Sequence, residues 1–212
     1  MSVNILILSD SVALPRQEPE HTNYTDTWPN LLKENGYTVF QCSIGGATLP
    51  DIRKQCFYYN PSCYKIDAVI LQCGIVDCAP RFLRKYELAF FQRLPKIGPK
   101  IIQLLNKNWI RKLRGITYTS KLRFEKNIKS ICNYFINNNI YFISIVPPNE
   151  NYEVILNGIT KNIKAYNDIL FNHTNVIDIN GIETFGVMPD HHHLNKEGHQ
   201  FVCDKIIKQL SE

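Results

Sequence analysis

Short, continuous apolar runs that end abruptly in small polar residues constrain the fold of this 212-residue chain most strongly. The runs 3–8 and 68–73 are rich in branched side chains and pass directly into loops. Runs of this length and character are typical of strands that are buried on both faces of a parallel sheet. Similar runs at 37–42, 140–146 and 176–179 predict three further strands.

Segments with helical periodicity separate these runs. They predict helices over 27–35, 122–138, 159–171 and 195–210, with a shorter helix that begins at Leu49. The 122–138 helix has an apolar set made up of Leu122, Ile128, Ile131, Cys132, Phe135 and Ile136. Strands that alternate with helices predict a three-layer α/β/α sandwich around a mainly parallel, five-stranded sheet. In such a fold the functional site lies beyond the carboxyl ends of the strands.

The composition predicts one globular domain over residues 1–212. Hydrophobic residues make up 44% of the chain and charged residues 20%, and this length can bury a full core without disulfides. Seven cysteines without a CxxC pair favour reduced thiols and a cytoplasmic location, with a Cys56–Cys63 pair as the alternative. The first apolar run is too short for a signal peptide, and no run approaches the ~20 residues of a transmembrane helix.

Four short motifs carry the residues that are suited to chemistry. Each of them follows a predicted strand, so we expect all four at one edge of the sheet. They are Ser9-Asp10-Ser11, Gly46 within 43–48, Gly74-Ile75-Val76-Asp77, and Asp190-His191-His192-His193.

Ser11, His193 and Asp190 are the residue types that nucleophilic ester cleavage requires. A serine hydroxyl attacks only when a base takes its proton, and a carboxylate fixes the tautomer of a histidine base. Asp190 and His193 lie three residues apart on one loop, so both can reach the same point. The N–H groups of Ser11 and Gly46 could bind an oxyanion, because Gly46 has no side chain to prevent close approach.

The order and spacing of the motifs resemble those of the SGNH, or GDSL, hydrolase superfamily of serine esterases and acyltransferases. That family has Gly-Asp-Ser after the first strand, Gly after the second, Gly-x-Asn-Asp after the third, and Asp-x-x-His near the C-terminus. The resemblance implies Ser11 as nucleophile, His193 as base, Asp190 as its orienting acid, an oxyanion hole formed by Ser11 and Gly46, and no cofactor.

Two positions depart from the family pattern. Ser9 stands in place of the first Gly, and Val76 stands in place of the Asn that gives the family a third oxyanion donor. Loss of one such donor typically lowers kcat by ~10²–10³-fold. Arg16 and Arg81 each follow a proline in a neighbouring loop and are candidates to replace the missing donor.

Arg16 and Arg81 also suggest that the substrate carries an anionic group, since a guanidinium binds carboxylate or phosphate through two hydrogen bonds. Local pairing with Glu18 or Asp77 is the alternative. Asp10 and Asp77 complete the expected substrate-binding set, although Asp77 can equally fix the loops by accepting backbone N–H groups.

These residues favour a serine hydrolase that cleaves an O-acyl group, such as an acetyl, from a carbohydrate or other small-molecule ester. The 15–16, 74–81 and 27–29 stretches are similar to family members associated with bacterial surface-polysaccharide synthesis. One alternative is an acyltransferase that passes the acyl group from Ser11 to a glycan hydroxyl. Another is a non-catalytic glycan-binding protein with the same fold, an interpretation that Val76 keeps open.

The three consecutive histidines do not predict a metal site. Neighbouring loop residues point in different directions, and neither an HExxH motif nor a cysteine partner accompanies them. His193 alone has the spacing to Asp190 that the family pattern requires. We expect His191 and His192 to be exposed loop residues.

The segment 88–114 mixes aromatic, aliphatic and basic side chains. It belongs to a predicted helical insertion at about 82–115 that Pro95 and Pro99 interrupt, and it has no acidic residue from Arg93 to Arg114. The net charge of +5 favours an acidic partner, but no nucleic-acid-binding module accompanies it, so we expect no nucleic-acid partner. A lid over the site, a cover over the core and a peripheral contact with a membrane surface remain as interpretations.

Overall fold

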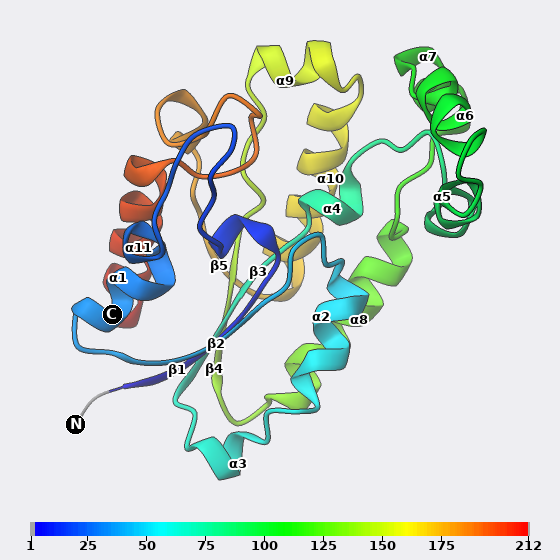
Figure 1. The fold of residues 1–212 in the computed structure, drawn as a ribbon. Coiled ribbons are helices and arrows are strands. Elements are labelled where there is room, and N and C mark those ends of the chain that lie inside the picture. Colours follow the sequence, from blue (N-terminus) through cyan, green and yellow to red (C-terminus); the bar gives the residue numbers. More distant parts are fainter. Residues whose placement is uncertain (1–2, 212) are drawn as a thin grey trace.

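The computed structural model describes residues 3–211; residues 1, 2 and 212 of the predicted 1–212 domain lie outside the described residues. Its centre is a five-stranded sheet in the order β2-β1-β3-β4-β5, with every neighbouring pair parallel (Figure 1). The strands are β1 (Asn4–Ser9), β2 (Thr38–Ser43), β3 (Ala68–Gln72), β4 (Asn139–Ile143) and β5 (Asn175–Ile177). The predicted five-stranded parallel sheet is confirmed.

Helices cover both faces of this sheet. On one face α1 (Trp28–Glu34) packs against α11 (Lys196–Ser211). On the other, α8 (Lys121–Tyr134) packs between α2 (Leu49–Cys56) and α10 (Ile159–His173). The predicted three-layer sandwich is therefore confirmed. Shorter helices lie in the connections: α3 (Pro61–Tyr64), α4 (Ile75–Cys78), α9 (Glu150–Ile155), η1 (Ser11–Ala13), η2 (Tyr24–Asp26) and η3 (Ile182–Thr184).

The two central strands determine where a site can form. The side chains from Ile5 to Leu8 are completely buried, and β3 is buried along its whole length. Because β1 lies between β2 and β3, the order of the strands reverses there. The carboxyl ends of β1 and β3 therefore flank the switch point at which sheets of this kind bind their ligands.

Helix α8 ends earlier than the sequence predicted. It stops at Tyr134 instead of residue 138, and Leu122 and Ile136, which were placed on its apolar face, are exposed. The buried stripe follows a spacing of four, three and four residues, so neither Leu122 nor Ile136 can share it. That stripe consists of Phe124, Ile128, Ile131 and Phe135.

Strand β4 also ends early, at Ile143 instead of residue 146. The N–H of Ile145 is bound by the side-chain oxygen of Asn167 at 2.8 Å, so it is unavailable to a neighbouring strand. All seven cysteines are free thiols, and Cys56 is buried while Cys63 is exposed, so the alternative Cys56–Cys63 pair is not formed.

The predicted helical insertion consists of α5 (Lys85–Gln92), α6 (Gly98–Leu105) and α7 (Asn108–Arg114). Pro95 separates the first two helices as expected, but Pro99 lies in the first turn of α6, where proline is tolerated. An antiparallel bridge between Arg81 and Ile116 joins the start and end of the insertion. Figure 1 shows the three helices grouped at the upper right, away from the sheet, so they do not cover the core.

Candidate active site

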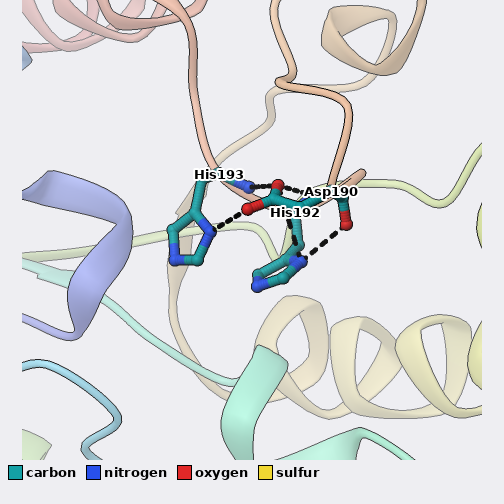
Figure 2. Close-up of side chains that lie close together, drawn as sticks. All are labelled: Asp190, His192 and His193. Atoms are coloured by element: carbon teal, nitrogen blue, oxygen red, sulfur yellow. Dashed lines mark hydrogen bonds and ion pairs between the residues drawn. The ribbon is translucent and has the colours of Figure 1, made fainter. Parts of the chain in front are cut away.

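Ser11, His193 and Asp190 form a continuous hydrogen-bonded chain. The Oγ of Ser11 lies 3.0 Å from Nε2 of His193, and Nδ1 of the same ring lies 2.6 Å from Oδ2 of Asp190. The second of these contacts is drawn in Figure 2. An ionised carboxylate only accepts hydrogen bonds, so Nδ1 carries the ring proton and Nε2 presents its lone pair to the serine. This arrangement activates a serine for nucleophilic attack.

Local backbone interactions position both ends of this chain. Ser11 begins η1 directly after β1, and Asp10 caps that turn by accepting the N–H of Val12 at 2.9 Å. At the other end, Oδ1 of Asp190 accepts the N–H of His193 at 3.0 Å. Because its second oxygen holds the ring, the carboxylate fixes both the backbone and the imidazole of His193.

The carboxyl group of Asp190 is held in its charged form. Partial burial by itself would raise its pKa, but the hydrogen bond from His193 and the proximity of His192 lower the pKa below its ordinary value. A carboxylate that stays ionised keeps the proton on Nδ1 of His193.

His191 and His192 are not exposed loop residues, contrary to the sequence prediction. Both are partly buried against α9: Tyr152 stacks on His192 at 5.7 Å between ring centroids, and Asn149 lies 3.0 Å from Nδ1 of His191. Burial, followed by the nearby His193, lowers the pKa of His192. Tyr152 and Asn149 thus form a wall of the site that the sequence analysis did not identify. The signal for it in the sequence was the position of Asn149 beyond the carboxyl end of β4.

Two backbone N–H groups near the nucleophile are available to a ligand. Within residues 3–211, neither the N–H of Ser11 nor that of Gly46 has a hydrogen-bond acceptor. Both groups follow strands that pair at Ser9 and Ser43. Gly46 has a φ of 70°, a left-handed conformation that a side chain would strain. Both N–H groups are thus free for the oxyanion-hole role expected from the sequence, and that role stays a prediction.

Arg16 is the cation that reaches the reacting groups. Its Nη2 donates a hydrogen bond to Nε2 of His193, the atom that also faces Ser11. The guanidinium and the serine hydroxyl therefore lie within about 6 Å of each other, given ordinary hydrogen-bond lengths. Its Nε is buried without an acceptor among the described residues, and no ion pair with Glu18 is formed.

Arg81 has a different position from the one expected. Its Nη2 donates to the carbonyl of Val76 at 3.2 Å, and its guanidinium lies 4.4 Å from the centre of the Tyr118 ring. Among the described residues, no contact links it to the Ser11–His193–Asp190 chain. Arg81 therefore fixes the end of α4, and its expected substrate-binding role finds no support in these contacts.

Asp10 and Asp77, which we expected to contact substrate, are both completely buried. Asp77 accepts the N–H of Leu49, at 3.0 Å to one oxygen, and so anchors the start of α2. Burial raises the pKa of Asp10 to about 7 and that of Asp77 to about 6. Both carboxyl groups lie beneath the site and have no surface for a substrate to contact.

Asp10→Asn is expected to change how stability depends on pH. The pKa of Asp10 is about 7 in the folded protein and ~3.9 in the unfolded chain, so its contribution to stability is greatest below pH ~4 and falls as the pH rises to about 7. As the pH is raised from about 5 to about 8, the free energy of unfolding of the variant should rise by roughly 2–3 kcal/mol relative to that of wild type. Urea unfolding at both pH values measures this, and parallel curves for the two proteins would contradict it.

Asp190, His192 and His193 are also the described residues that could together bind a metal ion, since their donor atoms lie within 4.8 Å of one another (Figure 2). Two of these atoms, Oδ2 of Asp190 and Nδ1 of His193, are already joined by the 2.6 Å hydrogen bond. A metal ion here would compete with the interaction that prepares His193 to act as a base.

Several solved structures resemble this chain in fold. A lipase/acylhydrolase from Enterococcus faecalis is 14% identical, with 98% of this chain and 95% of that chain covered and a TM-score of 0.64. A lipolytic protein of the G-D-S-L family from Veillonella parvula is 12% identical over the whole of both chains, with a TM-score of 0.60. The chain has the SGNH-hydrolase fold. No family model and no curated protein matches the sequence.

The SGNH-hydrolase fold extends over nearly the whole chain in a third comparison. A variant of an acetyl-xylooligosaccharide esterase from Geobacillus is 16% identical, covers 100% of this chain and 96% of that one, and gives a TM-score of 0.60. At these identities the likeness is one of fold. The chemistry must therefore be argued from the residues of this chain.

Proposed function

We propose that this protein is a serine ester hydrolase that acts through an acyl-Ser11 intermediate. The observation that carries the proposal is the hydrogen-bonded chain from Ser11 through His193 to Asp190, at the carboxyl ends of the central strands. Nucleophile, base and orienting acid lie at the distances that this chemistry requires.

The reaction follows from the positions of these groups. Nε2 of His193 takes the hydroxyl proton as Oγ of Ser11 bonds to the ester carbonyl carbon, and the carbonyl oxygen becomes an oxyanion. The free N–H groups of Ser11 and Gly46 stabilise that charge. The ester C–O bond then breaks and His193 returns the proton to the departing alcohol. Water, deprotonated by His193, releases the acid and restores Ser11.

The substrate proposed here is an O-acyl, such as O-acetyl, carbohydrate. One fold neighbour is an acetyl-xylooligosaccharide esterase, which supports an acetylated sugar as the substrate. The guanidinium of Arg16 beside the nucleophile also favours a negatively charged group on the substrate.

Arg16 supplies the donor that Val76 cannot. The guanidinium of Arg16 shares the single lone pair of His193 Nε2 with Ser11, so a substrate must draw the guanidinium away before the base can act. The oxyanion that forms on the substrate offers the guanidinium of Arg16 a charged acceptor. Arg16 would therefore stabilise the transition state more than the ground state, which raises kcat.

Arg16→Ala is expected to lower kcat for a neutral aryl acetate by ~10²–10³-fold, the usual effect of losing one oxyanion donor. The exposed Arg123 of α8 provides the matched control, and Arg123→Ala should keep the wild-type rate. Introducing Val76→Asn into the Arg16→Ala variant should recover part of kcat, because it adds an amide donor after β3. A neutral-ester kcat that is unchanged in Arg16→Ala would contradict the role.

Intact-mass analysis after reaction with a fluorophosphonate tests the proposed function. One covalent adduct that maps to Ser11, together with release of acetate from acetylated sugars, supports an esterase. An adduct with acetyl transfer to an added sugar and little hydrolysis would favour the acyltransferase alternative. A folded protein that forms no adduct would overturn the proposal and favour the binding-protein alternative.

A further inference from the structure

The excess of positive charge in this chain lies in the insertion. Residues 82–115 contain nine basic residues and one acidic residue, Glu87. The remainder of the chain has fifteen basic and eighteen acidic residues, so it is slightly acidic despite the overall charge of +5. An excess of this kind on one exposed element predicts an interaction with a negatively charged partner.

Five exposed basic residues of the insertion are free to meet such a partner, whereas Lys85 is paired with Asp51 at 3.0 Å. Within residues 3–211, Arg114 is bound to Glu87 at 2.7 Å, while the other exposed cations of 93–112 form no ion pair. These unpaired cations are Arg93, Lys96, Lys100, Lys107 and Lys112. Since no local carboxylate neutralises them, their charge is available for binding.

Each of the three helices also exposes large apolar side chains. On α5 they are Tyr86 and Phe90, and on α7 they are Trp109 and Leu113, in each case one helical turn apart. Leu104 is exposed on α6. Side chains four residues apart lie on the same side of a helix, so each pair forms a small apolar surface.

The insertion adjoins the wall of the candidate site. The side chain of Asn108, at the start of α7, donates to the carbonyl of Val154 on α9 at 3.4 Å. Val154 and Ile155 are themselves exposed, while Tyr152 on the same helix stacks against His192. Figure 1 shows α7 and α9 at the same edge of the molecule. Exposed apolar side chains therefore lie on α9 as well as on the insertion, and α9 also contributes a wall of the site.

We propose that α5–α7, together with the exposed end of α9, bind the protein peripherally to an anionic lipid surface. Basic side chains meet the headgroups, and the aromatic and aliphatic side chains enter the boundary with the acyl chains. None of the helices in the part of the chain that the structure describes is long and apolar enough to span a bilayer. Docking in this orientation brings the Ser11 edge close to the membrane.

The apolar side chains favour a membrane over a nucleic acid or a soluble polyanion. Phosphate groups alone would satisfy the lysines and arginines, but they would leave Phe90, Trp109 and Leu113 in water. A lipid surface binds both kinds of side chain, because burial of the apolar area adds to the electrostatic attraction between cations and headgroups.

Sedimentation with vesicles tests the proposal on the whole chain, with no assay of activity. We expect binding to vesicles of phosphatidylcholine with phosphatidylglycerol, little binding to phosphatidylcholine alone, and release by high salt. Fluorescence gives a second readout, because Trp28 is fully buried and Trp109 is 65% exposed. A blue shift on binding therefore reports that Trp109 has left water.

Matched variants locate the contact. The triple variant Lys100→Gln, Lys107→Gln, Lys112→Gln should lower the partition coefficient by about a hundredfold, and Lys54→Gln, Lys126→Gln, Lys208→Gln should leave it unchanged. Leu104→Ser with Leu113→Ser should lower it at least ~10-fold. Its control is Leu122→Ser with Ile136→Ser, which lies outside the insertion. The control side chains are 78% and 74% exposed, close to the 70% of Leu104 and the 76% of Leu113.

Three results would overturn the proposal. The first is that folded protein binds neither kind of vesicle. The second is that the control variants lose as much binding as the insertion variants. The third is that binding occurs without a blue shift of Trp109 and is matched by heparin at the same ionic strength, which would identify a surface for soluble polyanions.

Discussion

Ser11→Ala is expected to lower kcat for ester hydrolysis by at least ~10⁴-fold and to abolish the fluorophosphonate adduct. The Oγ of Ser11 is the atom that His193 activates, and alanine leaves no nucleophile at that point. Residual activity would come from oxyanion binding to an attacking water. Steady-state kinetics with p-nitrophenyl acetate and intact-mass analysis measure the two effects.

Ser43 provides the matched control for this substitution. It ends the neighbouring strand β2, and its hydroxyl is hydrogen-bonded to Ser9 instead of to a histidine. Ser43→Ala should retain the adduct and most of the activity. If Ser11→Ala were still labelled and active at the wild-type rate, another residue would be the nucleophile and the proposed mechanism would be wrong.

Asp190→Asn is expected to lower kcat by ~10³–10⁴-fold while the protein remains folded. An amide can donate to Nδ1 of His193, which shifts the ring proton to Nε2. That nitrogen then faces Ser11 with a hydrogen and cannot accept the hydroxyl proton. Kinetics at saturating substrate separate this loss of kcat from an effect on KM.

The pH dependence provides a further check on Asp190. Its pKa is lowered in the folded protein, so the interaction stabilises the fold above the ordinary Asp pKa of about 4 and is lost as the pH falls below it. Acid unfolding of Asp190→Asn should therefore be less steep than that of wild type. The exposed Asp168 on α10 provides the control, Asp168→Asn. Equal kcat values for the two variants would contradict the role of Asp190 in orienting His193.

The sequence predicted the strands, the layers and the edge at which the motifs meet. Continuous apolar runs such as that of β1 are typical of strands buried on both faces of a parallel sheet, and the topology of such a sheet brings the loops after β1, β2 and β3 together. Spacing alone placed Asp190 and His193 on one loop, and the structure joins them to Ser11. These features depend on local pattern and chain order.

Only the tertiary structure distinguished residues of the same type from one another. Arg16 and Arg81 both follow a proline after a motif, yet the first contacts His193 and the second stacks on Tyr118. Asp10 and Asp77 looked suited to substrate binding, but both are buried beneath the site. The sequence shows which charges are present, whereas their roles depend on which side chains from distant segments pack beside them and exclude water.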